Sequence, residues 1–192
     1  SAVPLEVGDV RHVGAFDDLV QRGRRGGNEG QCGEQQGCCD QHRVELALDG
    51  RNWKSIQSSS GAKAPAQFRD ALANARVEPA EIGYVEAHGT GTANNDQAES
   101  AAINSLFEQI PPVSSTKAYT GHTLGAAGSI EAVFSLLAMR EQLVFPNLNH
   151  LEKMEENDWL PVTSIQKKEI EHVLSNSFGF GGNNTSLIFS KH

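Results

Sequence analysis

Two short turns that each carry a histidine constrain the fold more than any other part of this sequence. His88 follows the apolar run from Ile82 to Ala87, and His122 follows a second run that begins at Val113. Each run is short enough to be a buried strand and ends in a turn rich in glycine and hydroxyl side chains, and a long helical pattern comes next. We therefore expect both imidazoles at strand ends, where α/β proteins place their chemistry.

The pattern of apolar residues from residue 65 onward predicts alternating helices and strands. Helices are expected from Pro65 to about residue 75, after Asp96, and from Ala126 to about Gln142. Strands are expected at 82–87, 113–115, 173–176 and 185–189, with the last two paired antiparallel. Residues 145–170 carry turn formers and are expected to cross the surface. This order predicts an α/β layered domain with a mixed sheet.

The sequence also suggests which residues cap and bury two of these helices. Asp96 and Glu99 have the spacing of a capping box, which places the start of the middle helix at Asp96. The apolar positions of this helix are Ala98, Ala102, Leu106 and Phe107. The last helix is expected to bury one stripe, formed by Ile130, Val133, Phe134, Leu137 and Ala138. Its first turn is rich in glycine and alanine, which allows close approach to another backbone or to a ligand.

Length and charge restrict the class of protein. A chain of 192 residues suits one domain, and its net charge of −8 argues against unspecific binding to nucleic acid or to anionic membrane. No apolar run reaches the ~20 residues that span a bilayer, and the first residues lack the pattern of a signal peptide. We therefore expect a cytoplasmic protein with no membrane or nucleic-acid partner.

The first 50 residues differ from the rest. They show neither a helical nor a strand period, and only 10–20 and 44–48 could hold short elements, so we expect a poorly structured or atypical segment at 1–50 and the folded domain at 51–192. Cys32, Cys38 and Cys39 lie in this segment, with His42 nearby. Their spacing matches no common zinc-ligand pattern, which favours reduced thiols in a loop.

The residues around the two histidines form a polar constellation. Thr90 and Thr92 follow His88 and offer hydroxyls to an extended polar ligand. A neutral imidazole that donates from one ring nitrogen is expected for His122. Lys117 is embedded among hydroxyl residues, so we expect it in a polar network with Glu131 as its counter-charge.

The sequence carries four motifs in a characteristic order: His88–Thr92, Ser115–Lys117 with Gly121–His122, Gly125–Gly128 and Asn176–Asn183. Together they resemble the β-ketoacyl-acyl-carrier-protein synthases, and above all the elongating condensing enzymes of bacterial type II fatty acid synthesis. The order and spacing of the motifs make the match specific, because each of them alone would be weak. The resemblance implies the C-terminal half of the thiolase fold, which is half of an αβαβα sandwich with helices on the faces of a mixed five-stranded sheet.

The resemblance also implies an activity and roles for individual residues. Family members are acyltransferases: they decarboxylate malonyl-carrier protein, and the resulting enolate attacks an acyl thioester held on a cysteine. His88 and His122 match the histidine pair that stabilises the enolate oxygen, with Lys117 and Glu131 in the polar network around them. Thr90 and Thr92 match the threonines that bind phosphopantetheine, and Phe180 matches the gating phenylalanine. Asp96 and Glu99 match acidic positions of the family, whereas Phe178 is expected to serve packing.

One element of the family is missing from this chain. The nucleophilic cysteine of the family lies in its N-terminal half, in a turn between a strand and a helix. Cys39 is followed by Asp40 and has no apolar strand before it, so nothing here would turn its thiol into a thiolate. We therefore expect the chain to work with a nucleophile-bearing half and with acyl carrier protein, as part of a homodimeric enzyme that needs no cofactor and no metal.

Two other functions were weighed against this one. The chain could be a non-catalytic partner that resembles a chain-length factor and pairs with a true synthase, although such a subunit would not need both histidines and Lys117. A metal hydrolase that uses His88, His122 and Asp96 is the third reading, but the spacing of these residues is no common ligand pattern.

Overall fold

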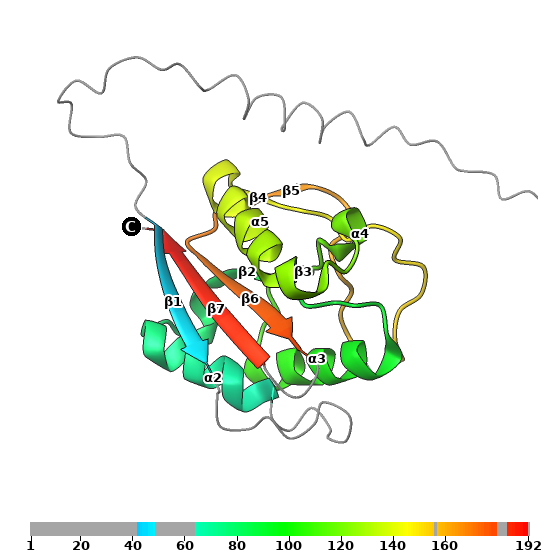
Figure 1. The fold of residues 1–192 in the computed structure, drawn as a ribbon, viewed down its shortest axis with the longest axis horizontal. Coiled ribbons are helices and arrows are strands. Elements are labelled where there is room, and N and C mark those ends of the chain that lie inside the picture. Colours follow the sequence, from blue (N-terminus) through cyan, green and yellow to red (C-terminus); the bar gives the residue numbers. More distant parts are fainter. Residues whose placement is uncertain (1–41, 49–63, 156, 180–183, 192) are drawn as a thin grey trace, which may run out of the picture. The chain divides into compact units, whose positions relative to one another are not determined.

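The computed structural model describes residues 42–48, 64–155, 157–179 and 184–191. Their central feature is a five-stranded sheet with the order β1-β7-β6-β2-β3 (Figure 1). The strands are β1 (His42–Leu48), β2 (Ile82–Glu86), β3 (Val113–Ser114), β6 (His172–Phe178) and β7 (Asn184–Lys191). β2 runs parallel to both β3 and β6, whereas β7 runs antiparallel to β6 and β1. The expected mixed sheet and the antiparallel closing pair are confirmed.

Helices cover both faces of this sheet (Figure 1). On one face, α2 (Ala64–Ala75) and α3 (Ala93–Leu106) pack on the strands through one core that includes Phe68, Leu72 and Ile103. α5 (Ala127–Glu141) lies on the other face, where it contacts β6. The expected α/β layering is therefore confirmed. The apolar residues of α2 recur at helical spacing, and this is why one side of that helix is buried.

Short elements connect these layers. They are the 3-10 turns η1 (Pro79–Glu81) and η2 (Leu124–Ala126), the one-turn helix α4 (Lys117–Thr120), and a two-stranded sheet of β4 (Leu143–Val144) and β5 (Gln166–Lys167). Pro79 begins η1, which leads directly into β2. Pro111 and Pro112 separate α3 from β3, because proline cannot continue a helix.

The strand β1 was the least certain element in the sequence. By sequence, residues 44–48 could hold a short element within a segment expected to be poorly structured, whereas the structure has a strand over His42–Leu48 that pairs along its whole length with β7. The sheet therefore begins before residue 51, the expected start of the domain. The three cysteines and the possible element at 10–20 lie outside the described residues.

Two details of the helices differ from the expectation. α3 begins at Ala93, with Thr92 as its N-terminal cap position, so the predicted capping box of Asp96 and Glu99 is wrong. α5 buries a stripe that is rotated from the predicted one. Val133 is 55% exposed, whereas polar Glu131 and Ser135 are buried. The prediction failed because it assigned the inner face to apolar residues alone, and this face carries the polar side chains that serve the site.

The stretch 145–170 is anchored more firmly than a surface connection. Phe145, Val162 and Ile170 are buried, and the backbone N–H of Val162 donates to the carbonyl of Val113 in β3. The exposed part lies between these anchors, and it includes Leu151, which is 91% exposed. No helix in the described ranges is both long and apolar enough to cross a membrane.

Candidate active site

The ends of three parallel strands bring the candidate residues together. His88 lies two residues after β2, Lys117 follows β3, and Ser177 is the second-to-last residue of β6. Because β2, β3 and β6 are parallel, their carboxyl ends meet at one edge of the sheet. His122 arrives at this edge by a different route, from the loop after α4. The rings of His88 and His122 lie edge to face, with their centroids 5.5 Å apart.

The protonation of His88 follows from its neighbour. Lys117 Nζ lies 3.2 Å from His88 Nδ1, and an ammonium group can only donate, so Nδ1 is the acceptor and the ring proton is on Nε2. Burial lowers the pKa of His88 to about 3, and the charges of Lys117 and His122 act in the same direction. His88 is therefore a neutral imidazole with an Nε2–H group to donate.

His122 has the same tautomer for a different reason. The backbone N–H of Leu124 donates to His122 Nδ1 over 3.4 Å, which leaves the ring proton on Nε2. The side chain is exposed, and it lies at the surface where a ligand can reach it. The two imidazoles thus present two N–H donors at the same edge of the sheet, an arrangement that suits an oxygen on which negative charge develops.

A buried ion pair supports Lys117. Lys117 Nζ donates to Glu131 Oε1, and both side chains are buried. The second carboxylate oxygen, Oε2, accepts the hydroxyl proton of Ser177 at 2.8 Å. This is the contact that the sequence analysis expected between Lys117 and Glu131. The bond between Glu131 and Ser177 requires the first turn of α5 to lie close to β6. Gly128 allows this approach, because a Cβ at that position would lie only 3.0 Å from Ser177 Oγ.

Glu99 holds the turn that carries His88. Its two carboxylate oxygens accept the backbone N–H groups of His88 and Gly89, each over 2.9 Å, and Asn176 donates to it over 3.3 Å. Burial raises the pKa of Glu99 to about 7, while these three donors act in the opposite direction. Glu99 therefore anchors the site from α3 instead of capping that helix.

The remaining candidates lie at the rim of the site. Thr92 is exposed and Thr90 is half-buried, and their hydroxyl oxygens lie 2.9 Å apart. The ring of Phe178 lies 5.3 Å from that of His88 and 6.4 Å from that of Phe68, so Phe178 joins the site to the core. Phe180 lies outside the described residues.

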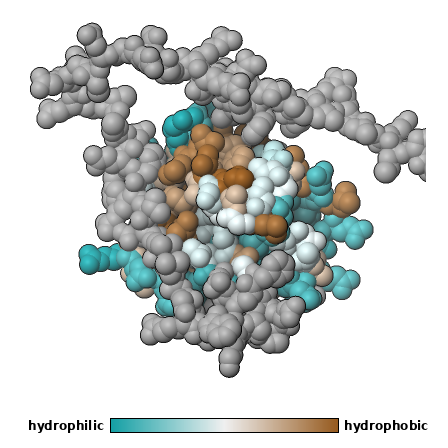
Figure 2. All heavy atoms as spheres, viewed as in Figure 1, coloured by the Kyte–Doolittle hydropathy of each residue, from teal (hydrophilic) through white to brown (hydrophobic). Residues whose placement is uncertain are grey.

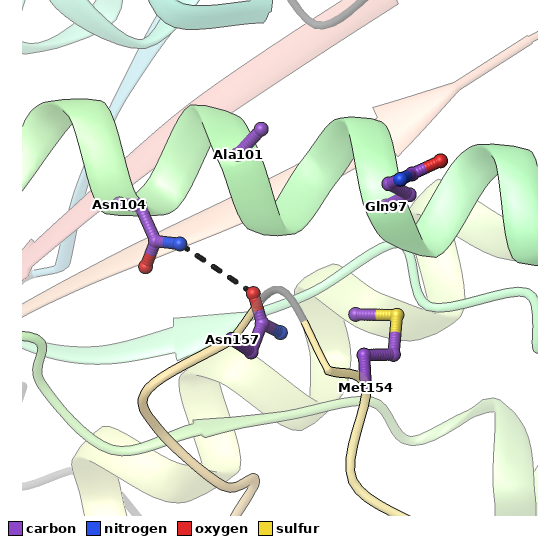
Figure 3. A pocket seen from close by; sticks show the side chains of 5 residues that line it. All are labelled: Gln97, Ala101, Asn104, Met154 and Asn157. Carbon is purple, nitrogen blue, oxygen red and sulfur yellow. Dashed lines mark hydrogen bonds between the residues drawn. The ribbon is translucent and has the colours of Figure 1, made fainter.

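A cavity away from the histidines lies where the 154–157 segment meets α3. It has a volume of about 260 Å³ and is lined by Gln97, Ala101, Asn104, Met154 and Asn157 (Figure 3). The amides of Asn104 and Asn157 point toward one another, with 3.4 Å between Nδ2 and Oδ1. Within the described part of the chain, no three His, Cys, Asp or Glu side chains lie close enough together to hold a metal ion.

Sequence reasoning missed the buried carboxyl of Glu86, and it assigned Glu99 to a helix cap and not to the His88 turn. Glu99 lies three and four residues before Ala102 and Ile103, which are buried on the same helix face. Glu86 lies two residues after Tyr84 and shares one face of a buried strand with it. A glutamate at a core position was the available signal in both cases, since such a residue is rarely buried without partners.

The fold and the site together define a class: an α/β domain that offers two histidine N–H donors and a buried lysine at the ends of parallel strands. A profile described as "Beta-ketoacyl synthase, C-terminal domain" matches residues 42–151. The chain belongs to the β-ketoacyl synthase family, and the resemblance seen in the sequence is confirmed.

Individual relatives agree with this assignment. The chain is 41% identical over 141 residues to 3-oxoacyl-[acyl-carrier-protein] synthase 2 of Vibrio harveyi, an alignment that covers 70% of the chain and 34% of the relative. It is 45% identical over 112 residues to 3-oxoacyl-[acyl-carrier-protein] synthase 1 of Escherichia coli K12, covering 57% of the chain and 28% of the relative. The chain therefore spans about a third of the length of the curated relatives it matches.

A solved structure matches the fold. A ketosynthase in complex with its chain length factor, from Xenorhabdus doucetiae, superimposes with a TM-score of 0.65 at 42% identity. The match covers 78% of this chain and 38% of the solved one. The thiolase-like α/β fold that the resemblance implied is thus confirmed for the part of the family that this chain represents.

Proposed function

We propose that this chain supplies the enolate-stabilising half of a 3-oxoacyl-acyl-carrier-protein synthase. The observation that carries the proposal is the pair of imidazoles, each with its proton on Nε2, at one edge of the sheet. In the reaction, the malonyl thioester loses carbon dioxide and becomes an enolate. The enolate carbon then attacks an acyl thioester on the nucleophilic cysteine, and the cysteine thiolate leaves.

The histidine pair serves the first of these steps. Negative charge moves onto the thioester oxygen as the carbon–carbon bond to the carboxylate breaks. Two N–H donors that are already in position stabilise this charge without reorganisation, which lowers the barrier. Neutral imidazoles fit the task because their N–H groups are much weaker acids than those of imidazolium, so they donate a hydrogen bond to the enolate without transferring the proton.

The other candidates have supporting roles. Lys117 fixes the tautomer and the orientation of His88, and Glu131 balances its charge inside the protein. Thr90 and Thr92 would bind the polar phosphopantetheine arm of the carrier protein, because their hydroxyls lie at the rim of the site, in the turn that follows His88. Phe180 would gate the acyl group. We expect the complete enzyme to be a cytoplasmic homodimer that needs no cofactor.

The experiment is to take a relative, remove the region that this chain matches, and mix the remaining nucleophile-bearing part with the chain. We expect the mixture to form a 3-oxoacyl product from malonyl-carrier protein and an acyl thioester, and neither part to do so alone. The non-catalytic partner subunit is the second candidate, because the Xenorhabdus doucetiae ketosynthase pairs with a chain length factor. If the chain binds a complete synthase but does not restore activity to the truncated relative, the catalytic proposal is contradicted and the non-catalytic partner subunit is supported.

A further inference from the structure

A second buried carboxyl lies behind the site, and the steps described above do not use it. Glu86 ends β2 and is fully buried, as is Tyr84 two residues earlier. Glu86 Oε2 lies 2.5 Å from the hydroxyl of Tyr84, which lies 2.7 Å from Ser114 Oγ. Ser114 Oγ lies 2.6 Å from the carbonyl oxygen of Phe145. Four oxygens thus form a chain with three short contacts.

The other carboxyl oxygen of Glu86 holds the residue before Lys117. The backbone N–H and the hydroxyl of Thr116 both donate to Glu86 Oε1, over 2.8 and 2.7 Å. Thr116 precedes α4 and is 1% exposed. Thr116 directly precedes Lys117, so a shift of Thr116 would move the Lys117 ammonium group away from His88 Nδ1.

Counting hydrogens decides the protonation of the chain of oxygens. Tyr84 and Ser114 have one hydroxyl hydrogen each, and the carbonyl of Phe145 has none. If Glu86 were ionised, two hydrogens would serve three contacts, and one pair of buried oxygens would meet without a hydrogen between them. A protonated Glu86 supplies the third. It donates to Tyr84, Tyr84 donates to Ser114, and Ser114 donates to Phe145.

We propose that Glu86 is a positioning residue that holds Lys117 through Thr116, and that it does so as an uncharged carboxylic acid. The positioning part rests on the function proposed above for Lys117 and His88, whereas the protonation does not. Glu86 joins β2, β3 and the segment after β4 into one rigid unit behind the site.

The surroundings of Glu86 agree with an uncharged acid. Burial raises the pKa of Glu86 to about 7, and the carboxylate of Glu131 on α5 adds to this, while the hydrogen bonds that Glu86 shares with Tyr84 and Thr116 oppose it. Tyr119 on α4 is the next titratable group, and its pKa is raised to about 12 by burial and then by Glu86. From β6, the residue in register with Glu86 is the uncharged Ser175. Lys117, also on α4, directs its ammonium group to Glu131 and His88.

The first test is the pH dependence of unfolding of the chain and of Glu86→Gln. Glutamine mimics the acid, because its oxygen accepts from Thr116 and its N–H donates to Tyr84. The folded pKa lies above the unfolded value of 4.5, so the stabilisation is complete below pH 4.5 and is lost as the pH rises toward 7. Relative to Glu86→Gln, the unfolding constant of the parent chain should rise about tenfold per pH unit in this window. Equal pH profiles for the two chains would overturn the protonation.

The second test probes the position of Lys117 without any activity assay. Acetylation of the buried Lys117 is compared with that of the exposed Lys153 by mass spectrometry. We expect Lys117 to stay protected in Glu86→Gln and to become at least tenfold more reactive in Glu86→Leu. Leu72→Ala is the matched control, since it weakens the core on the opposite face of the sheet and should leave Lys117 protected.

Two outcomes would overturn the positioning role. Lys117 would remain as protected in Glu86→Leu as in the parent chain, or it would become reactive in Leu72→Ala to the same extent. If Glu86→Leu does not fold, Thr116→Val replaces it, because this variant removes one of the two donors to Glu86. If the reconstituted enzyme proves inactive, only the function fails, because both tests are read from the chain itself.

Discussion

Gly89 is the residue on which the shape of the His88 turn depends most directly. Its φ is +43°, and a Cβ at this position would lie 2.5 Å from Ser115 Cβ. Gly91 has a φ of +74° but nothing within 4 Å of such a Cβ. The two glycines share the left-handed backbone and differ in the space around them.

Gly89→Ala should therefore cost more stability than Gly91→Ala. We expect about 1–2 kcal/mol for Gly91→Ala from the left-handed backbone, and a further ~1–3 kcal/mol for Gly89→Ala from overpacking. Denaturant unfolding measures both, and Ser115→Gly in the Gly89→Ala background should recover the overpacking part. Equal losses for the two alanine variants would show that Ser115 does not confine the turn.

The neutral state of His88 also makes a prediction about acid. Its pKa is lowered in the folded chain from 6.5 to about 3, so the unfolded chain binds a proton at a higher pH than the folded one. The contribution to stability is present above pH 6.5 and is lost as the pH falls toward 3. The stability difference between the parent chain and His88→Gln should shift in this direction between pH 7 and 5. A difference that stays constant over this range would mean that His88 titrates normally.

Helix α3 acts on the site through one side chain. Glu99 accepts N–H groups of His88 and Gly89, whereas Asp96, one turn earlier, is partly exposed and accepts a hydrogen bond from the side chain of Asn95 over 3.2 Å. Glu99→Gln would place an amide donor against a backbone donor, and we expect a loss of about 1–3 kcal/mol. Asp96→Asn is the matched control and should change the free energy of unfolding little. A larger loss for Asp96→Asn would restore the capping role.

The elements differ in how well the sequence predicts them. α2 and β2 were predicted because their apolar residues follow one clear period and proline marks their ends. β4 and β5 were not, since strands of two residues leave no period to detect and, unlike β3, neither runs into a turn rich in glycine and hydroxyl side chains. The stripe of α5 was placed wrongly because Glu131 and Ser135 face inward, where the ion pair with Lys117 satisfies the carboxylate.

The same limit applies to the candidate site. Its histidines, Lys117 and Glu131 could be found from motif spacing, because each motif lies at the end of a predicted strand or the start of a helix. The roles of Glu86 and Glu99 depend on partners 30 and 10–11 residues away across the fold, and no local pattern contains such pairs. Buried polar networks are fixed by tertiary packing, so the partners of Glu86 and Glu99 could not be predicted from the sequence.

On the scale of the whole molecule, the outer face of α5 and the turn η2 before it expose large apolar side chains. Val133 is 55% exposed and Leu124 is 67% exposed, and Figure 2 shows hydrophobic side chains gathered over α5. The chain also spans about a third of its curated relatives. Under the function proposed above, the nucleophile-bearing half is expected to cover this face.

The chain alone should therefore self-associate at micromolar concentrations, as measured by sedimentation velocity. Val133→Glu should reduce this self-association and also weaken binding of the nucleophile-bearing half. Leu151→Glu is the control, because Leu151 is 91% exposed in a different segment, and it should change neither property. A parent chain that stays monomeric and melts cooperatively would contradict the inference.

The most direct test of the proposed function is the rate at which the reconstituted halves decarboxylate malonyl-carrier protein. We expect His88→Ala and His122→Ala each to lower this rate by about 10²–10³-fold. The double variant should fall by less than the product of the two losses, because both donors serve one oxygen. His172→Ala, at the amino end of β6 and therefore at the opposite end of the sheet from the site, should leave the rate unchanged. A rate that neither His88→Ala nor His122→Ala alters would contradict the claim that these two imidazoles stabilise the enolate.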